Sequence, residues 1–204
     1  MCRIDVIIPT CKMLDKVRVL IDMLEENTPE PHRIIATCQE VSAGKNRNYG
    51  LEIAESPIVV MIDDDMKGFF PGWLSKIIQP IEEDRNVCMV LARLLNPDGT
   101  PAQNSSNNYD MKSKWCYVQR KVLPSSAIAM RDIGLRFDTV YIGSGFEDTD
   151  MCFQYHQTNP KYEFVINNEC PLIHLNEMKN QKGNVWEHNE AAFLEKWNNR
   201  MSPV

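Results

Sequence analysis

The stretch "SPIVVMIDDDM", Ser56 to Met66, leads from an apolar segment directly into three adjacent aspartates. Its centre, "IVVMI", is a short apolar run, which is typical of a strand buried on both faces of a parallel sheet. Asp63, Asp64 and Asp65 then follow at the carboxyl end of that strand. Because adjacent like charges repel one another, the pattern predicts a positively charged partner at this point of the fold.

Strand and helix patterns alternate in the segments before this strand. "IDVIIP" (4–9) and "RIIATC" (33–38) predict strands, whereas 12–27 has apolar residues at helical spacing and 42–56 reads as a loop that leads into a helix. An order of strand, helix, strand, helix, strand is typical of a parallel α/β sheet with right-handed crossovers.

Further elements follow the aspartates. Residues 66–84 predict a turn and a helix, 87–95 a strand, and 96–110 a polar loop. The second half predicts shorter strands, a helix at 147–157 and a final amphipathic helix at 187–200. We therefore predict an α/β fold in one domain, with a mostly parallel central sheet flanked by helices.

Composition limits the classes of function. The chain has 204 residues, 43% hydrophobic and 25% charged, with a net charge of −6, so no overall charge attracts nucleic acid. Its seven cysteines are odd in number and form no CxxC pair, which favours reduced thiols over disulfides or a zinc site. No secretory leader opens the sequence and no apolar run approaches the ~20 residues of a membrane span. We expect a soluble cytoplasmic protein.

The three aspartates are candidate ligands of a metal ion. Ligands of open α/β sheets bind at the carboxyl ends of the strands. Side chains alternate along an extended chain, so Asp63 and Asp65 should share one face and Asp64 the other. Two carboxylates on one face suit Mg²⁺ or Mn²⁺. Alternatively, the aspartates cap the next helix or accept hydrogen bonds from loop amides. Taken alone, the motif fits a nucleotidyltransferase, a phosphatase or a glycosyltransferase.

Six segments occur in order along about residues 4–177. They are "DVIIPT" (5–10), "SAGKNRNYGLEIAES" (42–56), "MIDDDM" (61–66), "PGWLSKIIQPIEED" with "RLLNPDGTP" (71–84 and 93–101), "SSAIAMRDIGLRFDTVYIGSGFEDTDMCFQ" (125–154) and "LIHLNE" (172–177). On these segments the chain resembles family-2-like glycosyltransferases of the GT-A fold. As a small and acidic protein, the chain also resembles glycosyltransferase domains encoded by large algal viruses. That resemblance would place the protein in a host cytoplasm.

The resemblance implies a Rossmann-like nucleotide-diphospho-sugar transferase fold over 1–204. About residues 1–95 would bind the nucleotide sugar, and about 96–204 would bind the acceptor and include the C-terminal helix. The implied activity is transfer of a hexosyl group from a UDP-sugar to a hydroxyl of a glycan or glycoprotein. The chain departs from the family where an Asp-rich turn usually follows the second strand, since it reads "TCQEVSAG" (37–44). This departure leaves the nucleobase open.

The resemblance also implies that Asp63 and Asp65 hold Mn²⁺ or Mg²⁺, with His174 completing the site. Such an ion offsets the charge that develops on a diphosphate leaving group. Alternatively, His174 is a core histidine bonded to the backbone, and Lys45 and Arg47 are solvated or pair with the aspartates. The implied donor-binding residues are Pro9, Thr10, Gln39, Glu40, Lys45, Arg47, Asp63 and Asp64.

An acceptor hydroxyl needs a general base. In "GFEDTD" the resemblance assigns this role to Asp148, with Glu147 as the second candidate. Attack from the face opposite the diphosphate would invert the anomeric carbon; retention would leave Asp148 as a binding residue. Acidic residues also favour helix N-termini, and we interpret Asp150 as such a helix-capping residue.

Four aromatic residues are considered as sugar-stacking candidates. Tyr109 lies at the end of the polar loop and Trp115 just after it. Trp186 follows "HLNE", where it could belong to a lid over the donor. These three are the predicted acceptor-binding residues. Most aromatic residues are core residues, and we predict that role for Trp73.

Two other functions remain open. A sugar-1-phosphate nucleotidyltransferase also pairs a nucleotide site with aspartates, but "PTCKMLDK" (9–16) lacks the Gly-rich basic loop expected after its first strand. A catalytically silent carbohydrate-binding domain is the second alternative, and it predicts that Asp148→Asn has no effect.

Overall fold

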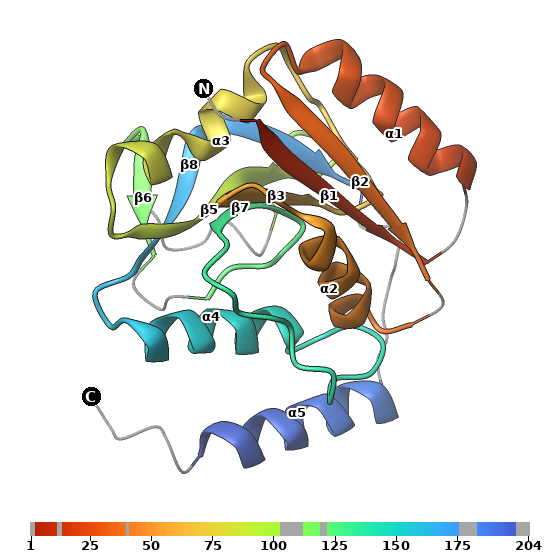
Figure 1. Cartoon of the computed structure of the whole chain (residues 1–204), viewed down its shortest axis with the longest axis vertical. Coiled ribbons are helices and arrows are strands. Elements are labelled where there is room, and N and C mark those ends of the chain that lie inside the picture. Colours follow the sequence, from red (N-terminus) through yellow and green to blue (C-terminus); the bar gives the residue numbers. More distant parts are fainter. Residues whose placement is uncertain are drawn as a thin grey trace.

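The computed structural model describes residues 3–11, 14–39, 41–102, 112–118, 122–175 and 183–198. Helices cover both faces of a central sheet, with α1 and α3 on one side, α2 and α4 on the other, and α5 outside α4 (Figure 1). The elements are β1 (Ile4–Thr10), α1 (Leu14–Asn27), β2 (His32–Cys38), α2 (Ala43–Ile53), β3 (Ile58–Ile62), β4 (Met66–Lys67), α3 (Trp73–Glu83), β5 (Val87–Leu95), β6 (Trp115–Tyr117), β7 (Ala127–Arg131), α4 (Glu147–Thr158), β8 (Glu163–His174) and α5 (Asn184–Trp197).

The strand order is β2-β1-β3-β7-β5-β8-β4, with β6 paired to β8. β1 runs parallel to both β2 and β3, and β5 runs parallel to β8. β7 is antiparallel to both β3 and β5, so β1, β2, β3, β5 and β8 all point in one direction. The α/β prediction with a mostly parallel sheet is confirmed. The shared direction brings the carboxyl ends of β1, β2, β3 and β8 to one edge.

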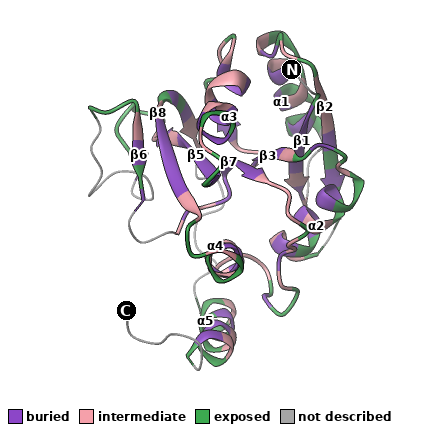
Figure 2. Ribbon diagram, turned by 60° about the vertical axis from the view of Figure 1, so that its left-hand side comes forward, coloured by how far each residue is buried: buried purple, intermediate pink, exposed green. Residues whose placement is uncertain are grey.

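The core lies between the sheet and its helices (Figure 2). In β3, Val59 to Ile62 are each 0% exposed, as the apolar run predicts. Trp73 is also fully buried, which confirms its prediction as a core residue, and its indole N–H donates to Thr28 Oγ1 at 2.8 Å. Among the described residues, no helix is long and apolar enough to cross a membrane.

β8 is longer than the short strands predicted for the second half, with twelve residues. Its pairing with β5 shifts register between Ala92 and Arg93, which face Asn167 and Pro171. Pro171 cannot donate a ladder hydrogen bond, and prolines within sheets occur at such irregularities. The irregularity therefore lets the strand continue past Pro171 to His174 at the carboxyl edge.

Asn167 supports this side of the fold. Pro80 lies inside α3 and has no N–H for the carbonyl of Lys76 four residues earlier. The fully buried Asn167 donates from Nδ2 to that carbonyl at 2.6 Å, and its Oδ1 accepts from the Glu169 N–H at 2.9 Å.

We expect Asn167→Ala to lower the free energy of unfolding by about 1–3 kcal/mol, because it leaves both backbone groups without this partner. Urea unfolding followed by circular dichroism measures the change. An unchanged unfolding midpoint would contradict this role of Asn167.

Candidate active site

The three aspartates lie in a tight turn between β3 and β4. The Asp63 N–H donates to the Ser126 carbonyl at 2.8 Å, and the Met66 N–H donates to the Asp63 carbonyl at 3.2 Å. The backbone turns here instead of staying extended, but Asp63 and Asp65 still point to one place, as predicted, with ligand atoms within 4.8 Å of each other. Asp64 lies beside β1, where it accepts a hydrogen bond from Thr10 Oγ1 at 2.6 Å. Asp65 points toward His174.

His174 reaches the aspartates because its strand ends beside β4, where Met66 and His174 are paired. Its Nε2 lies 3.1 Å from Asp65 Oδ1. Burial lowers the pKa of His174, but the hydrogen bond to Asp65 and the charges of Asp65 and Asp63 outweigh burial and raise it. Asp63, Asp65 and His174 each offer a ligand atom within 4.8 Å of the others. The two carboxylate oxygens suit Mn²⁺ or Mg²⁺, and the imidazole nitrogen favours Mn²⁺, because Mg²⁺ prefers oxygen ligands.

Arg47, on α2, connects this cluster with the "GFEDTD" segment. Its side chain is buried; Nη2 lies 3.0 Å from Asp63 Oδ1 and Nη1 lies 3.1 Å from Glu147 Oε1. Of the alternatives left open for Arg47, the structure shows the ion pair with an aspartate. The guanidinium is therefore a positive partner of the kind that the triplet predicts.

We expect Arg47→Met to lower the free energy of unfolding by about 3 kcal/mol, because removing one partner leaves buried negative charge without compensation. Arg3→Met is the matched control, since Arg3 pairs with Glu55 at 3.0 Å on the surface and should contribute less than about 1 kcal/mol. Urea unfolding of both variants measures the difference. Equal losses would contradict a structural role for the Arg47 bridge.

Glu147 and Asp148 begin α4 and have different surroundings. The buried carboxylate of Glu147 accepts hydrogen bonds from the Gly145 N–H, from Ser144 Oγ at 3.4 Å and from Arg47. Asp148 is half-buried, and its Oδ1 accepts from the Thr149 N–H at 2.7 Å. Burial and the nearby charge of Glu147 raise the pKa of Asp148 to about 7, against the opposing charge of Arg47. A carboxyl group that titrates near neutral pH suits acid–base chemistry.

The interpretation of Asp150 as a helix cap is wrong. Its carboxylate is fully buried, and it accepts from Trp197 Nε1 at 2.7 Å and from Gln154 Nε2 at 2.7 Å. Lys196 Nζ lies 2.8 Å from Asp150 Oδ1. These partners come largely from α5, whose packing against α4 is a tertiary contact that residue spacing does not predict.

The predicted donor-binding residues lie mostly at the carboxyl edge. Pro9 and Thr10 end β1, and the exposed Gln39 follows β2. Glu40 lies outside the described residues. Lys45 is exposed on α2, whose first turn is capped by Ser42. Sequence reasoning missed Asn46, whose buried side chain donates to the Thr10 carbonyl. Its neighbours Lys45, Arg47 and Asn48 are also polar, so the sequence carries no signal that sets Asn46 apart.

The three predicted acceptor-binding residues do not lie together in the structure. Tyr109 lies outside the described residues. Trp115 is on β6, opposite Asn167 in the middle of β8, and is not brought to the carboxyl edge. Trp186, in the first turn of α5, is 49% exposed and packs on Phe146 with ring centroids 4.8 Å apart. It therefore lies beside the start of α4, where Asp148 is located.

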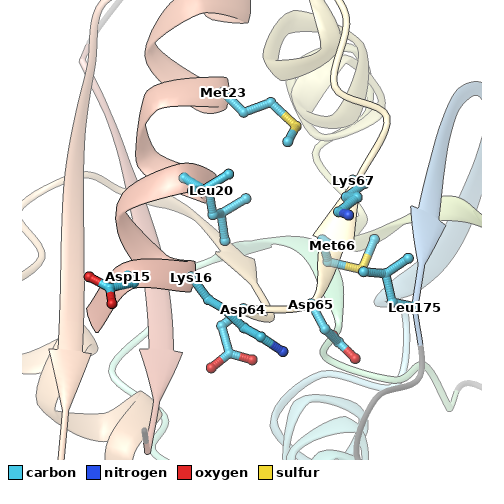
Figure 3. A pocket seen from close by; sticks show the side chains of 10 residues that line it. Asp15, Lys16, Leu20, Met23, Asp64, Asp65, Met66, Lys67 and Leu175 are labelled. Carbon is cyan, nitrogen blue, oxygen red and sulfur yellow. The ribbon is translucent and has the colours of Figure 1, made fainter. Parts of the chain in front are cut away.

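A cavity of about 280 Å³ adjoins the aspartates on the α1 side (Figure 3). Asp64 and Asp65 form part of its wall. The pKa of Asp64 is raised, mainly by burial and also by the negative charges of Asp63 and Asp65. The hydrogen bond from Thr10 and the positive charge of Lys16 lower this pKa in part. The remaining lining residues are Asp15, Lys16, Val19, Leu20, Met23, Met66, Lys67 and Leu175. Sequence reasoning missed this cavity, because helical spacing predicts which α1 residues face the core and not where α1 leaves space.

A family model, glycosyl transferase family 2, matches residues 14–134. The chain therefore belongs to glycosyl transferase family 2, which confirms the resemblance. The matched residues include Arg47 and the three aspartates and end before Glu147. No curated protein matches the chain.

Solved structures show the same fold. A crystal structure of GalNAc-T7 with UDP, GalNAc and Mn²⁺ superposes with a TM-score of 0.68 and 12% identity, over 96% of this chain and 48% of that one. Two crystal structures of S. aureus TarS give TM-scores of 0.65 and 0.64 with 15% and 14% identity, over 85% of this chain and 60% and 37% of theirs. The chain thus has the GT-A fold and spans about half the length of GalNAc-T7.

Proposed function

We propose that the chain is a metal-dependent glycosyltransferase that transfers a hexosyl group from a UDP-sugar to a hydroxyl of a glycan or glycoprotein, with inversion. The observation that carries the proposal is the convergence of Asp63, Asp65 and His174 at the carboxyl edge of the sheet. Family membership and the fold shared with a UDP- and Mn²⁺-containing structure support it.

The donor would bind across the carboxyl edge. Asp63, Asp65 and His174 would hold Mn²⁺ or Mg²⁺, whose positive charge would offset the charge of the diphosphate leaving group. The proposed contacts of the nucleoside and its phosphates are Pro9 and Thr10 at the end of β1, Gln39 after β2, Lys45 on α2, and Asp64, which is bonded to Thr10. The remaining predicted donor-binding residues are Glu40, Arg47 and Asp63. They keep that role as predictions, and Arg47 also pairs with Asp63.

Asp148 is the proposed general base. It would take the proton of the acceptor hydroxyl as that oxygen attacks the anomeric carbon from the face opposite the diphosphate, which inverts this carbon. Glu147 is less suited to the role, because its carboxylate already accepts hydrogen bonds from Gly145, Ser144 and Arg47. Trp186, half exposed beside the start of α4, is the best placed of the predicted acceptor contacts.

Activity should rise with pH and level off above about pH 7, because Asp148 acts as a base only when ionised and its pKa is about 7. A bound cation would move this acidic limb to lower pH, since positive charge stabilises the carboxylate. Measuring kcat/KM from about pH 5 to about pH 8 tests this. A profile that falls with rising pH over this range would contradict the assignment.

A thermal-shift experiment tests the function. We expect UDP to raise the melting temperature in the presence of Mn²⁺ and much less in its absence, because a ligand that binds the folded state stabilises it by about 2.7 kcal/mol at a hundred times its Kd. UDP-sugars and glycan acceptors, assayed for release of UDP, then test transfer. If no nucleotide diphosphate changed the melting temperature with Mn²⁺ present, the proposal would fail. Turnover only of a sugar 1-phosphate with a nucleoside triphosphate would support the nucleotidyltransferase alternative.

A further inference from the structure

Helix α5 lies beyond the residues matched by the family model, yet it holds the loop that leads to the proposed base. Asn189 of α5 is fully buried. Its Oδ1 accepts from the Ile142 N–H at 3.0 Å, and its Nδ2 donates to the carbonyls of Ile142 and Gly145, each at 2.9 Å. One side chain thus binds three backbone groups of the loop of residues 142–146, which leads directly into Glu147.

The loop has a backbone conformation that needs such support. Gly143, Gly145 and Phe146 have φ angles of 57°, 116° and 68°. Glycine adopts positive φ freely, whereas a residue with a side chain is strained there by roughly 1–3 kcal/mol. Phe146 is that residue, and it directly precedes α4. Strain of this kind persists only where surrounding contacts maintain it.

Aromatic side chains of α5 supply these contacts. The ring of Phe146 packs on Trp186 at 4.8 Å and on Phe193 at 5.4 Å between centroids. A Cβ on Gly145 would meet the Trp186 ring at 3.4 Å, so the helix lies in contact with the loop backbone. Helix α5 therefore holds the loop in two ways, through hydrogen bonds to the loop backbone and through packing on the side chain of its one strained residue, Phe146.

Helix α5 is also attached to the chain on both sides of the loop. Lys196 Nζ lies 2.7 Å from Asp138 Oδ2, ahead of the loop, and 2.8 Å from Asp150 Oδ1, inside α4. Trp197 Nε1 donates to the same Asp150 carboxylate. These ion pairs anchor the C-terminal half of α5, while Asn189 and the aromatic rings act at the loop itself.

We propose that α5 positions the general base, with Asn189 as the positioning residue that fixes residues 142–146 and thereby the direction in which Asp148 leaves the start of α4. The inference rests on the proposed glycosyl transfer. Asn189 is bonded to the loop and not to Asp63, Asp65 or His174, so its loss should reduce kcat and leave binding of the donor nucleotide intact.

The test compares Asn189→Ala with Asn167→Ala, measuring kcat for transfer and the Kd of UDP with Mn²⁺, below the melting temperature of either variant. Asn167 is an equally buried asparagine that binds backbone groups of α3 and β8. We expect Asn189→Ala to lower kcat at least tenfold with a Kd for UDP within twofold of the unsubstituted chain, and Asn167→Ala to change neither by more than twofold. If Asn189→Ala does not fold, Phe193→Leu, which loosens the packing on Phe146, should lower kcat in the same selective way.

If the unsubstituted chain does transfer sugar, two results would overturn the inference. One is a kcat of Asn189→Ala within twofold of the unsubstituted chain. The other is an equal loss of kcat in both asparagine variants, which would mark a general effect of destabilisation. If the unsubstituted chain neither bound UDP with Mn²⁺ nor transferred sugar, the proposed function would fall, and the inference with it.

Discussion

Asp65→Ala is expected to abolish the Mn²⁺-dependent stabilisation by UDP and to lower kcat/KM by at least about 10²-fold, the scale seen when one stabilising group of a transition state is removed. Asp65 is the aspartate in direct contact with His174, so its removal takes away one carboxylate and also releases the imidazole. The remaining Asp63 is paired with Arg47 and would be a weak ligand alone.

The control for this variant is Asp98→Ala, an exposed aspartate in the turn after β5. Isothermal titration of UDP with and without Mn²⁺, together with initial rates, measures both variants. Retention of Mn²⁺-dependent UDP binding by Asp65→Ala would show that the ion is held by other residues.

Asp148→Asn is expected to lower kcat by about 10²–10⁴-fold, the usual contribution of a general base, while leaving UDP binding with Mn²⁺ unchanged. Asparagine keeps the shape and the hydrogen-bond acceptor for Thr149 but cannot take a proton. A catalytically silent carbohydrate-binding domain would have no kcat to lose, and its function would be unaffected by Asp148→Asn. Wild-type kcat in this variant would remove Asp148 from the mechanism.

The same substitution should change stability in the opposite direction from activity. Because the folded-state pKa of Asp148 is raised above its ordinary value of 3.8 to about 7, the folded protein binds the proton more tightly than the unfolded chain. Ionisation therefore costs stability increasingly as pH rises from about 4 to about 7, and the cost is complete above about pH 7. An asparagine side chain has no charge to bury, so we expect Asp148→Asn to gain at least about 1 kcal/mol at pH 8 and almost nothing near pH 4.

Asp98→Asn provides a control of opposite sign. Hydrogen bonds from the Thr100 side chain and N–H lower the pKa of Asp98, so its ionised form stabilises the fold and that contribution is lost as pH falls. Asp98→Asn should therefore lose stability at pH 8 and still show much of that loss near pH 4, because the contribution disappears only as the pH falls below the lowered pKa of Asp98. Urea unfolding of both variants at the two pH values measures these changes. Equal shifts in both would contradict the burial of Asp148.

The elements that position the site follow from the sequence because their signals are local. The apolar run before Asp63 predicts a buried strand, and the alternation of strands and helices predicts that Thr10 and the aspartates reach one edge. The family motifs then identify His174 and Asp148 as candidates, and the structure brings His174 to Asp65.

Other features depend on tertiary contacts that residue spacing does not encode. The position of His174 depends on the irregularity near Pro171 and on pairing with β4. The role of Asp150 depends on where α5 packs. Trp115, chosen because it lies near the polar loop, pairs along β8 instead of reaching the site. In each case the partner of the residue lies far away in sequence.

Anomalous diffraction at the manganese edge, from crystals grown with Mn²⁺ and UDP, would locate the ion directly. We expect one strong peak within coordination distance of Asp63, Asp65 and His174, at about 2.0–2.3 Å from their ligand atoms, with the UDP phosphates on its open side. A UDP-bound crystal without such a peak, in which Asp63 still pairs with Arg47 and Asp65 with His174, would contradict metal-dependent glycosyl transfer at this site.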